Sequence, residues 1–231
     1  MLSDHISFRR TVSGILLILA PLLQAVAVMV DPGTWGDDRE TVSFGDNPAL
    51  AQVQSVLYHW SWILLAIGAL GLIHLTRRSH FRSGHILGAI TVVGYINASG
   101  LLLTDPVEWW LGQHYPPERA QQILEEMMGL PGPTFGFQMP WMFMAILGLP
   151  LLLVVVWRAG HAPWWVPLVT AAGYLGTFAV PYGPATVPMW TAPVVAIGWI
   201  GVRILRMSDE AWASFYAPGR TTPASYAKTT A

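Results

Sequence analysis

Residues 55–104 read SVLYHWSWILLAIGALGLIHLTRRSHFRSGHILGAITVVGYINASGLLLT, and this stretch decides the fold. Two apolar runs, Ser55–Ile73 and Ile86–Leu103, lie on either side of a short basic turn. Each run has about the 20 residues that a helix needs to cross a bilayer, and a helix satisfies its own backbone hydrogen bonds in lipid. Because short basic loops stay in the cytoplasm, Arg77, Arg78 and Arg82 place this turn on the cytoplasmic side and orient the hairpin.

The composition indicates a membrane protein. Of the 231 residues, 53% are hydrophobic and 11% are charged, whereas soluble domains carry about 25% charged residues. So few charges leave too little polar surface to face water, and the twelve tryptophans suit aromatic belts at the membrane interfaces. The sequence has no cysteine, which excludes disulfides, thiolate metal sites and cysteine nucleophiles.

The same criteria predict an all-α protein in which residues 1–206 form a bundle of six transmembrane helices. An extra amphipathic helix is expected in the outer loop between the third and fourth spans. Residues 207–231 are expected to form a short amphipathic helix and a disordered cytoplasmic tail. The spans are predicted at about residues 11–30, 55–76, 86–104, 139–157, 163–180 and 185–203.

An alternative interpretation concerns the first span. Arg9-Arg10, the apolar run Ile15–Leu23 and the motif Ala25-Val26-Ala27 together resemble a signal peptide that would be cleaved after residue 27. The apolar run continues past that motif to Val30 and so reaches full spanning length, which favours a retained first helix.

The charges are distributed unevenly along the chain. Ten of the 12 basic residues fall in segments predicted to lie inside, and ten of the 13 acidic residues fall in predicted outer loops. This asymmetry follows the positive-inside rule. It predicts a multi-pass protein of a bacterial cytoplasmic membrane with both the N- and C-termini in the cytoplasm.

The outer loops carry most of the exposed polar and aromatic residues. Within the longest loop, Pro117–Met128 has one apolar stripe and one acidic face, which predicts a helix that docks on the bundle mouth as a lid. The acidic residues could form a cation site, but the ligand spacing of a calcium loop is missing, so a solvated acidic face is the simpler interpretation. The predicted outer surface comprises Asp37, Asp38, Glu108, Trp109, Trp110, His114 and Glu125.

The predicted spans contain polar residues but no Asp, Glu, Lys or Arg at membrane depth. Proton- and ion-coupled carriers usually place charged groups near the midplane, so a coupled carrier is disfavoured. Interhelical hydrogen bonds are the expected role of these polar side chains. The candidates for the polar bundle interior are Gln24, His59, Tyr95, Asn97, Ser99, Tyr174 and Thr177.

His59 is the ionisable residue predicted to lie inside the bundle. A neutral imidazole bonded to a neighbouring helix is the simpler interpretation, and a haem ligand is the alternative. Haem would need a second axial ligand at the same depth, for which Met142 is a candidate. No paired-histidine spacing supports haem, so the sequence predicts no cofactor and no metal.

The first hundred residues resemble a known family. Arg9-Arg10, the segment Gly14–Pro21, and Tyr58-His59-Trp60 opening a long span that ends in Arg77-Arg78 are similar to a family of uncharacterised multi-span proteins from high-GC Gram-positive bacteria. The resemblance covers mainly residues 9–104. It implies a six-helix bacterial inner-membrane protein and transfers no catalytic residue.

These features lead to three hypotheses for the function. The first is a non-enzymatic protein that binds lipid or a protein partner through its outer loops, Asp31–Asn47 and Asp105–Gln138. The second is a redox subunit that binds haem or quinone around His59. The third is a permeation pathway for a small solute. A G-x-S-x-G motif is missing, nothing indicates a nucleic-acid partner, and the sequence leaves the oligomeric state open.

Overall fold

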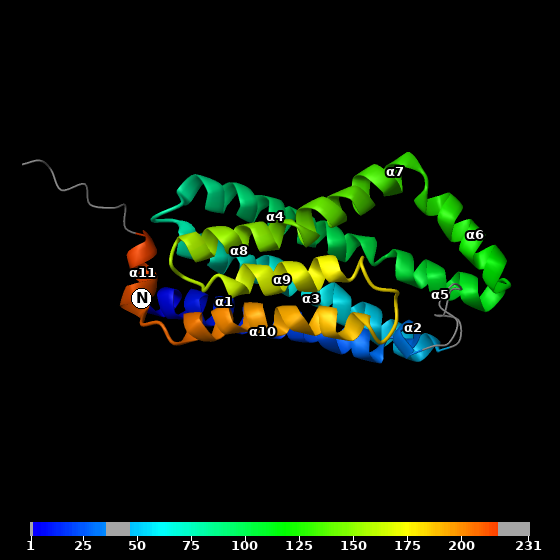
Figure 1. Ribbon diagram of the computed structural model, residues 1–231, viewed down its shortest axis with the longest axis horizontal. Coiled ribbons are helices and arrows are strands. Elements are labelled where there is room, and N and C mark those ends of the chain that lie inside the picture. The colour runs from blue at the N-terminus through cyan, green and yellow to red at the C-terminus, as the bar shows by residue number, and fades with distance from the viewer. Residues whose placement is uncertain (1, 36–46, 217–231) are drawn as a thin grey trace, which may run out of the picture.

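The computed structural model describes residues 2–35 and 47–216, which form helices and turns without any strand. Six helices lie side by side along one long axis (Figure 1). The all-α class agrees with the prediction. The six helices are α1 (Leu2–Val30), α3 (Pro48–Thr76), α4 (Phe81–Leu101), α8 (Gly148–Arg158), α9 (Trp165–Gly176) and α10 (Thr186–Leu205).

Shorter helices mark the two ends of the bundle. At one end lie α11 (Asp209–Ala213) and the 3-10 turn η4 (Ser214–Tyr216), close to the N-terminus (Figure 1). We call this the basic end, because Arg9, Arg77 and the last turns of α8 and α10 are there. At the other end lie α2 (Pro32–Trp35) and α5 (Thr104–His114). We call this the acidic end, after the three carboxylates described below.

Five helical segments are long and apolar enough to cross a membrane, so the chain is a multi-pass membrane protein in contact with lipid. Large apolar side chains are exposed along their outer faces, among them Leu22, Leu70, Ile96 and Val195, where hydrocarbon can cover them. The five segments are His5–Val30, Pro48–Thr76, Phe81–His114, Pro131–Arg158 and Thr186–Leu205.

The fifth predicted span is shorter in the structure than the sequence pattern suggests. The helix α9 has 12 residues, which is about 18 Å at 1.5 Å per residue, against about 30 Å for the hydrocarbon core. It begins just after Pro163, and the residues after Gly176 form turns. It nevertheless packs against both α8 and α10 within the bundle.

Close contact between helix backbones holds the bundle together. A Cβ atom on Gly201 of α10 would lie 2.6 Å from the carbonyl oxygen of Gly14 on α1. Such an approach is possible only where both helices carry a residue without a side chain. Glycines therefore form the close-packing face between α1 and α10.

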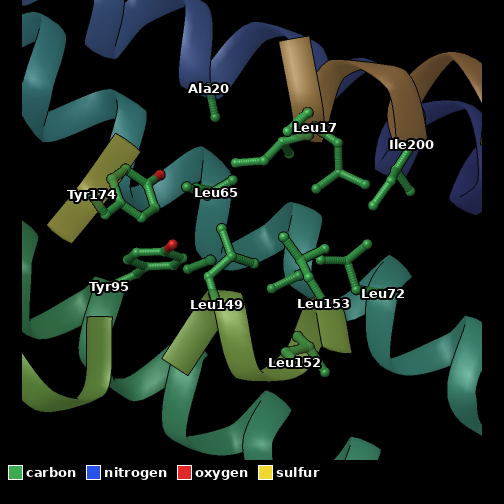
Figure 2. Close-up of a cluster of buried hydrophobic side chains, with 14 of the residues drawn as sticks. Leu17, Ala20, Leu65, Leu72, Tyr95, Leu149, Leu152, Leu153, Tyr174 and Ile200 are labelled. Atoms are coloured by element: carbon green, nitrogen blue, oxygen red, sulfur yellow. The ribbon is translucent and has the colours of Figure 1, made fainter. Parts of the chain in front are cut away.

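The core of the bundle is a cluster of leucines that meets aromatic rings on the side of the acidic end. Leu17, Leu65 and Leu149 come from three different helices and are fully buried. Figure 2 shows Tyr95 and Tyr174 side by side at one edge of this cluster. Burial of this apolar surface stabilises the bundle after it has inserted in the membrane, where packing takes over from the hydrophobic effect.

The amphipathic helix in the longest loop is confirmed as α6, with the predicted bounds Pro117–Met128. It packs against α5, which buries Ala120, while Glu125 is exposed. The prediction of a lid on the bundle mouth is not met. Asp105 and Pro106 lie in the first turn of α5 and do not end the third span. The segment Phe81–His114 is therefore nearly continuous and helical, and α6 lies beyond the end of the bundle (Figure 1).

The chain returns from α6 to the bundle through irregular helical turns. These are α7 (Pro131–Pro133) and two π-helical segments, η2 (Thr134–Gln138) and η3 (Trp141–Ile146). Beyond α10, the Ser208 hydroxyl accepts a hydrogen bond from the Ala211 N–H, 3.2 Å away, and caps α11 as its sequence indicates. Asp37, Asp38 and the predicted cytoplasmic tail from residue 217 lie outside the described residues.

Candidate functional site

A cavity of about 240 Å³ lies at the acidic end, where α3, α4, α5, η3 and α10 meet. Its wall combines aromatic rings with a few polar groups, a composition typical of ligand sites. The residues that matter for its chemistry are Gln54, Tyr58, Trp62, Asp105, Trp141, Tyr182 and Trp190.

The sequence of α3 explains one side of this cavity. Asn47 caps the helix by accepting a hydrogen bond from the Leu50 N–H, 3.3 Å away, and Pro48 occupies its first position. From this fixed start, residues four apart fall on the same helix face. Three cavity residues follow that spacing: Gln54, Tyr58 and Trp62.

The aromatic rings hold one another in place. Trp190 packs edge-on against Tyr58 and Trp62, with ring centroids 5.5 and 6.1 Å apart. Trp62 also packs against Tyr95, with the ring centroids 5.2 Å apart. Edge-to-face pairs of this kind add stability beyond the area that they bury. The cavity therefore has a rigid aromatic wall on the side of the bundle core.

Two residues of the cavity wall each carry a hydrogen-bond acceptor that has no donor within the described part of the chain. The Gln54 Oε1 and Asp105 Oδ2 atoms are buried, and neither has a hydrogen-bond partner among residues 2–35 and 47–216. Both residues are more than nine-tenths buried, with exposed fractions of 6% and 8%. Leaving a buried polar atom unpaired costs about 1–3 kcal/mol, and more for a charged group. A ligand that donates hydrogen bonds would remove that cost.

Two more carboxylates lie near Asp105. Asp31 and Glu108 interact electrostatically with Asp105 and with each other. Asp31 is fully buried, and its Oδ1 accepts a hydrogen bond from the Gly33 N–H at 2.9 Å. The Tyr182 hydroxyl donates to Asp31 Oδ2 and so joins this carboxylate to the cavity wall.

The acidic cluster affects the ionisation of Asp31. Burial raises the pKa of the Asp31 carboxyl from 3.8 to about 6, the hydrogen bond from Gly33 lowers this pKa, and the nearby Asp105 carboxyl raises it. A negative charge on all three carboxylates at once is therefore unfavourable. A bound cation would reduce that repulsion.

Two of the polar residues predicted inside the bundle, Gln24 and Asn97, make hydrogen bonds between different elements. The Tyr174 hydroxyl donates to Gln24 Oε1 at 3.1 Å and joins α9 to α1. Asn97 Nδ2 donates to the Phe137 carbonyl at 2.6 Å, and Thr177 donates to the Tyr174 carbonyl at 2.7 Å. The Tyr95 hydroxyl has no partner within the part of the chain that the structure describes.

His59 and Met142 occupy different surroundings. His59 Nδ1 lies 2.8 Å from the Ser99 hydroxyl, and its ring packs edge-on against Trp60. Met142 lines a separate hollow with Met128 and Met139. The described residues include no group of three or more His, Asp or Glu side chains arranged to hold a metal ion.

The remaining residues of the predicted outer surface lie on α5 and α6. Glu108 and Trp109 are half-buried, and the ring of His114 stacks on Trp110 at 4.4 Å between centroids. Glu125 is exposed and accepts a hydrogen bond from Gln121. Of the described members of this predicted set, Glu108 alone belongs to the acidic cluster beside the cavity.

The sequence pattern did not single out the cavity itself. In the sequence, Asp105 directly follows the predicted third span, and Gln54 directly precedes the predicted second span. The available signal was the i, i+4, i+8 spacing of Gln54, Tyr58 and Trp62, which places a polar residue in line with two aromatic residues.

No family model, curated protein or solved structure matches this chain. The resemblance of residues 9–104 to a bacterial family therefore stays a prediction, and the proposals below depend on the geometry of the chain itself.

Proposed function

We propose that this protein is a non-enzymatic binding protein of a bacterial cytoplasmic membrane, with six spans and both termini in the cytoplasm. Its acidic end faces the outside, and the cavity there binds a small organic cation with N–H groups, that is, a protonated primary or secondary amine. The amine can belong to a free solute or to a lipid headgroup.

The observation that supports this ligand class is the pair of unpartnered acceptors, Gln54 Oε1 and Asp105 Oδ2. An ammonium N–H group can donate to each of them. The positive charge is favoured by the Asp105 carboxylate at the cavity, by the Asp31 carboxylate near it, and by the aromatic rings of the cavity wall. A quaternary ammonium ion has no N–H group and would leave both acceptors unpaired.

The packing below the cavity favours binding over permeation. Trp62, Tyr95 and Tyr174 lie against one another at the inner side of the cavity. Beneath them the fully buried leucines, such as Leu65 and Leu149, pack together in the bundle core. A solute that enters at the acidic end would have to displace this packed core to cross.

A ligand series tests the proposal on the purified protein in lipid nanodiscs. We expect propylammonium to bind measurably by calorimetry at pH 7.5, and tetramethylammonium and the uncharged propanol to bind at least about tenfold more weakly. Binding is also measured to vesicles whose lipids have either ethanolamine or choline headgroups. Binding to the ethanolamine vesicles alone would indicate that the amine belongs to a lipid headgroup, and binding to neither would indicate a free solute. Equal binding of propanol and propylammonium would refute the proposal.

Variants in the cavity give a second test. Asp105→Asn and Gln54→Leu should each weaken propylammonium binding by about tenfold, because each removes one acceptor. Two matched controls are available on the exposed surface: Gln52→Leu on the same helix and Glu125→Gln on α6. Binding that falls equally in the controls would show that the cavity is not the site.

The orientation and the sixth span are tested with a reporter that is active only in the cytoplasm. We expect activity when the reporter is fused at Ser79, His161 or Ala231, and no activity at Arg119 or Tyr182. His161 and Tyr182 lie on either side of α9, so equal activity at these two positions would contradict a sixth span.

A further inference from the structure

A second cavity lies at the basic end, at the opposite end of the bundle from the proposed amine site. It encloses about 390 Å³ between the start of α1, the end of α3 and the C-terminal turns α11 and η4. Among the described residues, the polar part of its lining contains no carboxylate and consists of Arg9, Ser13, His74, Arg77, His85, Trp212 and Tyr216. The residues that carry the argument are Arg9, Leu70, Arg77, Trp212 and Tyr216.

The two arginines are held at this cavity by the same tyrosine. Arg9 donates to the Tyr216 hydroxyl at 3.3 Å, and the Arg77 guanidinium lies over the Tyr216 ring, 5.5 Å from its centroid. No acidic side chain is paired with Arg9 or Arg77 in the described part of the chain, whereas Arg10 binds Asp209 at 2.8 Å. Two guanidinium groups without an acidic partner therefore border one cavity.

Trp212 forms a buried part of the same cavity wall. Trp212 lines the cavity and is 1% exposed, and its Nε1–H has no acceptor in the described residues. Its backbone carbonyl is already bonded to His74 Nε2 at 2.9 Å, which fixes the residue against α3. The forks of Arg9 and Arg77 match the oxygens of a phosphate group.

The rest of the wall identifies the source of the phosphate. Phe8, Ile67 and Leu70 line the same cavity and are exposed by 67%, 44% and 55% on the outer face of the bundle. Apolar side chains at that position lie where acyl chains surround a membrane helix. A free phosphate ion would leave this apolar surface without a partner, while a phospholipid would cover it.

We propose that the basic-end cavity binds one anionic phospholipid, with its phosphate between Arg9 and Arg77 and its acyl chain along the apolar wall. Because Trp212 and Tyr216 come from the C-terminal turns, the bound lipid also joins these turns to α1 and α3. This proposal is independent of the amine site, since the two cavities share no residue.

The test compares lipids on the full chain purified in a neutral detergent. Native mass spectrometry and thermal unfolding are followed while phosphatidylglycerol, phosphatidylcholine or inorganic phosphate is added. We expect phosphatidylglycerol to remain bound and to raise the unfolding temperature, with phosphatidylcholine at least about tenfold weaker. If phosphatidylcholine bound as tightly as phosphatidylglycerol, the site would not be specific for anionic lipids. If inorganic phosphate raised the unfolding temperature as much as phosphatidylglycerol, the ligand would not need to be a lipid.

Charge variants locate the site. Arg9→Gln together with Arg77→Gln should weaken phosphatidylglycerol binding by at least about tenfold. Arg158→Gln removes an exposed arginine at the same end outside the cavity and should leave binding unchanged. The double variant Arg9→Lys and Arg77→Lys keeps both charges but loses the fork geometry, so it should bind phosphatidylglycerol more tightly than the Gln double variant and more weakly than the wild type. Equal loss of binding in the Lys and Gln double variants would contradict the role of charge at this site. An equal loss in Arg158→Gln would overturn the proposed location.

Discussion

The contact between α1 and α10 allows a sharp test of how the bundle is packed. A methyl group placed on Gly201 would meet the Gly14 carbonyl oxygen at 2.6 Å and Ile18 Cγ1 at 2.8 Å. To restore an ordinary contact of 3.4 Å, the two helices would have to separate by about 0.8 Å at this point. A backbone oxygen has no alternative rotamer, so the strain falls on the helix pair.

We therefore expect Gly201→Ala to lower the free energy of unfolding by about 1–3 kcal/mol, the range for overpacking in a well-packed core. The matched control lies one turn earlier on the same helix. A Cβ atom on Gly198 would meet nothing within 4 Å. Because alanine is a better helix former than glycine, Gly198→Ala should be neutral or stabilise by up to about 1 kcal/mol.

Both variants are measured by reversible unfolding of the detergent-solubilised protein, with helicity followed by circular dichroism. Gly201→Ala should unfold at a lower denaturant concentration than the wild type, and Gly198→Ala at an equal or higher one. If the two substitutions changed stability by the same amount, the close approach of α1 and α10 at Gly201 would be refuted.

Further predictions concern the acidic end, the core and the basic end. Between about pH 4 and pH 6, Asp31 holds a proton in the folded state that the unfolded chain releases, so the free energy of unfolding should fall as the pH rises through this range. In Asp31→Asn, unfolding titrations at several pH values should no longer show this fall. Leu153→Ala should destabilise the bundle by about 2–5 kcal/mol, because Leu153 is fully buried. Leu151 is exposed, so Leu151→Ala should change the free energy of unfolding by less than about 1 kcal/mol. Ser208→Ala removes the cap of α11 and should destabilise that helix by about 1 kcal/mol. Hydrogen exchange at α11 and η4 should then be faster, and unchanged exchange would argue against the cap.

The bounds of α6 were predictable because its signals are local. Pro117 at the first position and Gly129 after the last one act on the backbone of the helix itself, wherever the helix lies. Its position was not predictable in the same way. It depends on whether the chain bends at Asp105-Pro106, and the structure continues there almost straight from α4 into α5.

The amine cavity needed the tertiary structure for a different reason. Gln54 and Asp105 are each ordinary polar residues near the end of a helix, and they become a pair only because α3 and α5 meet. The same holds for Arg9 and Arg77, which Tyr216 brings to one cavity from the other end of the chain.

The sequence alone determined that this chain crosses a membrane several times, which segments are the apolar helices, and how the charges divide between the two ends. Hydropathy and charge act residue by residue within one span, so a local window contains the information. The tertiary structure decided that α9 is short, that α6 stands away from the bundle, and which polar groups share a cavity. In lipid every apolar helix face is nearly equivalent, so the choice of neighbours depends on close packing and hydrogen bonds between distant residues.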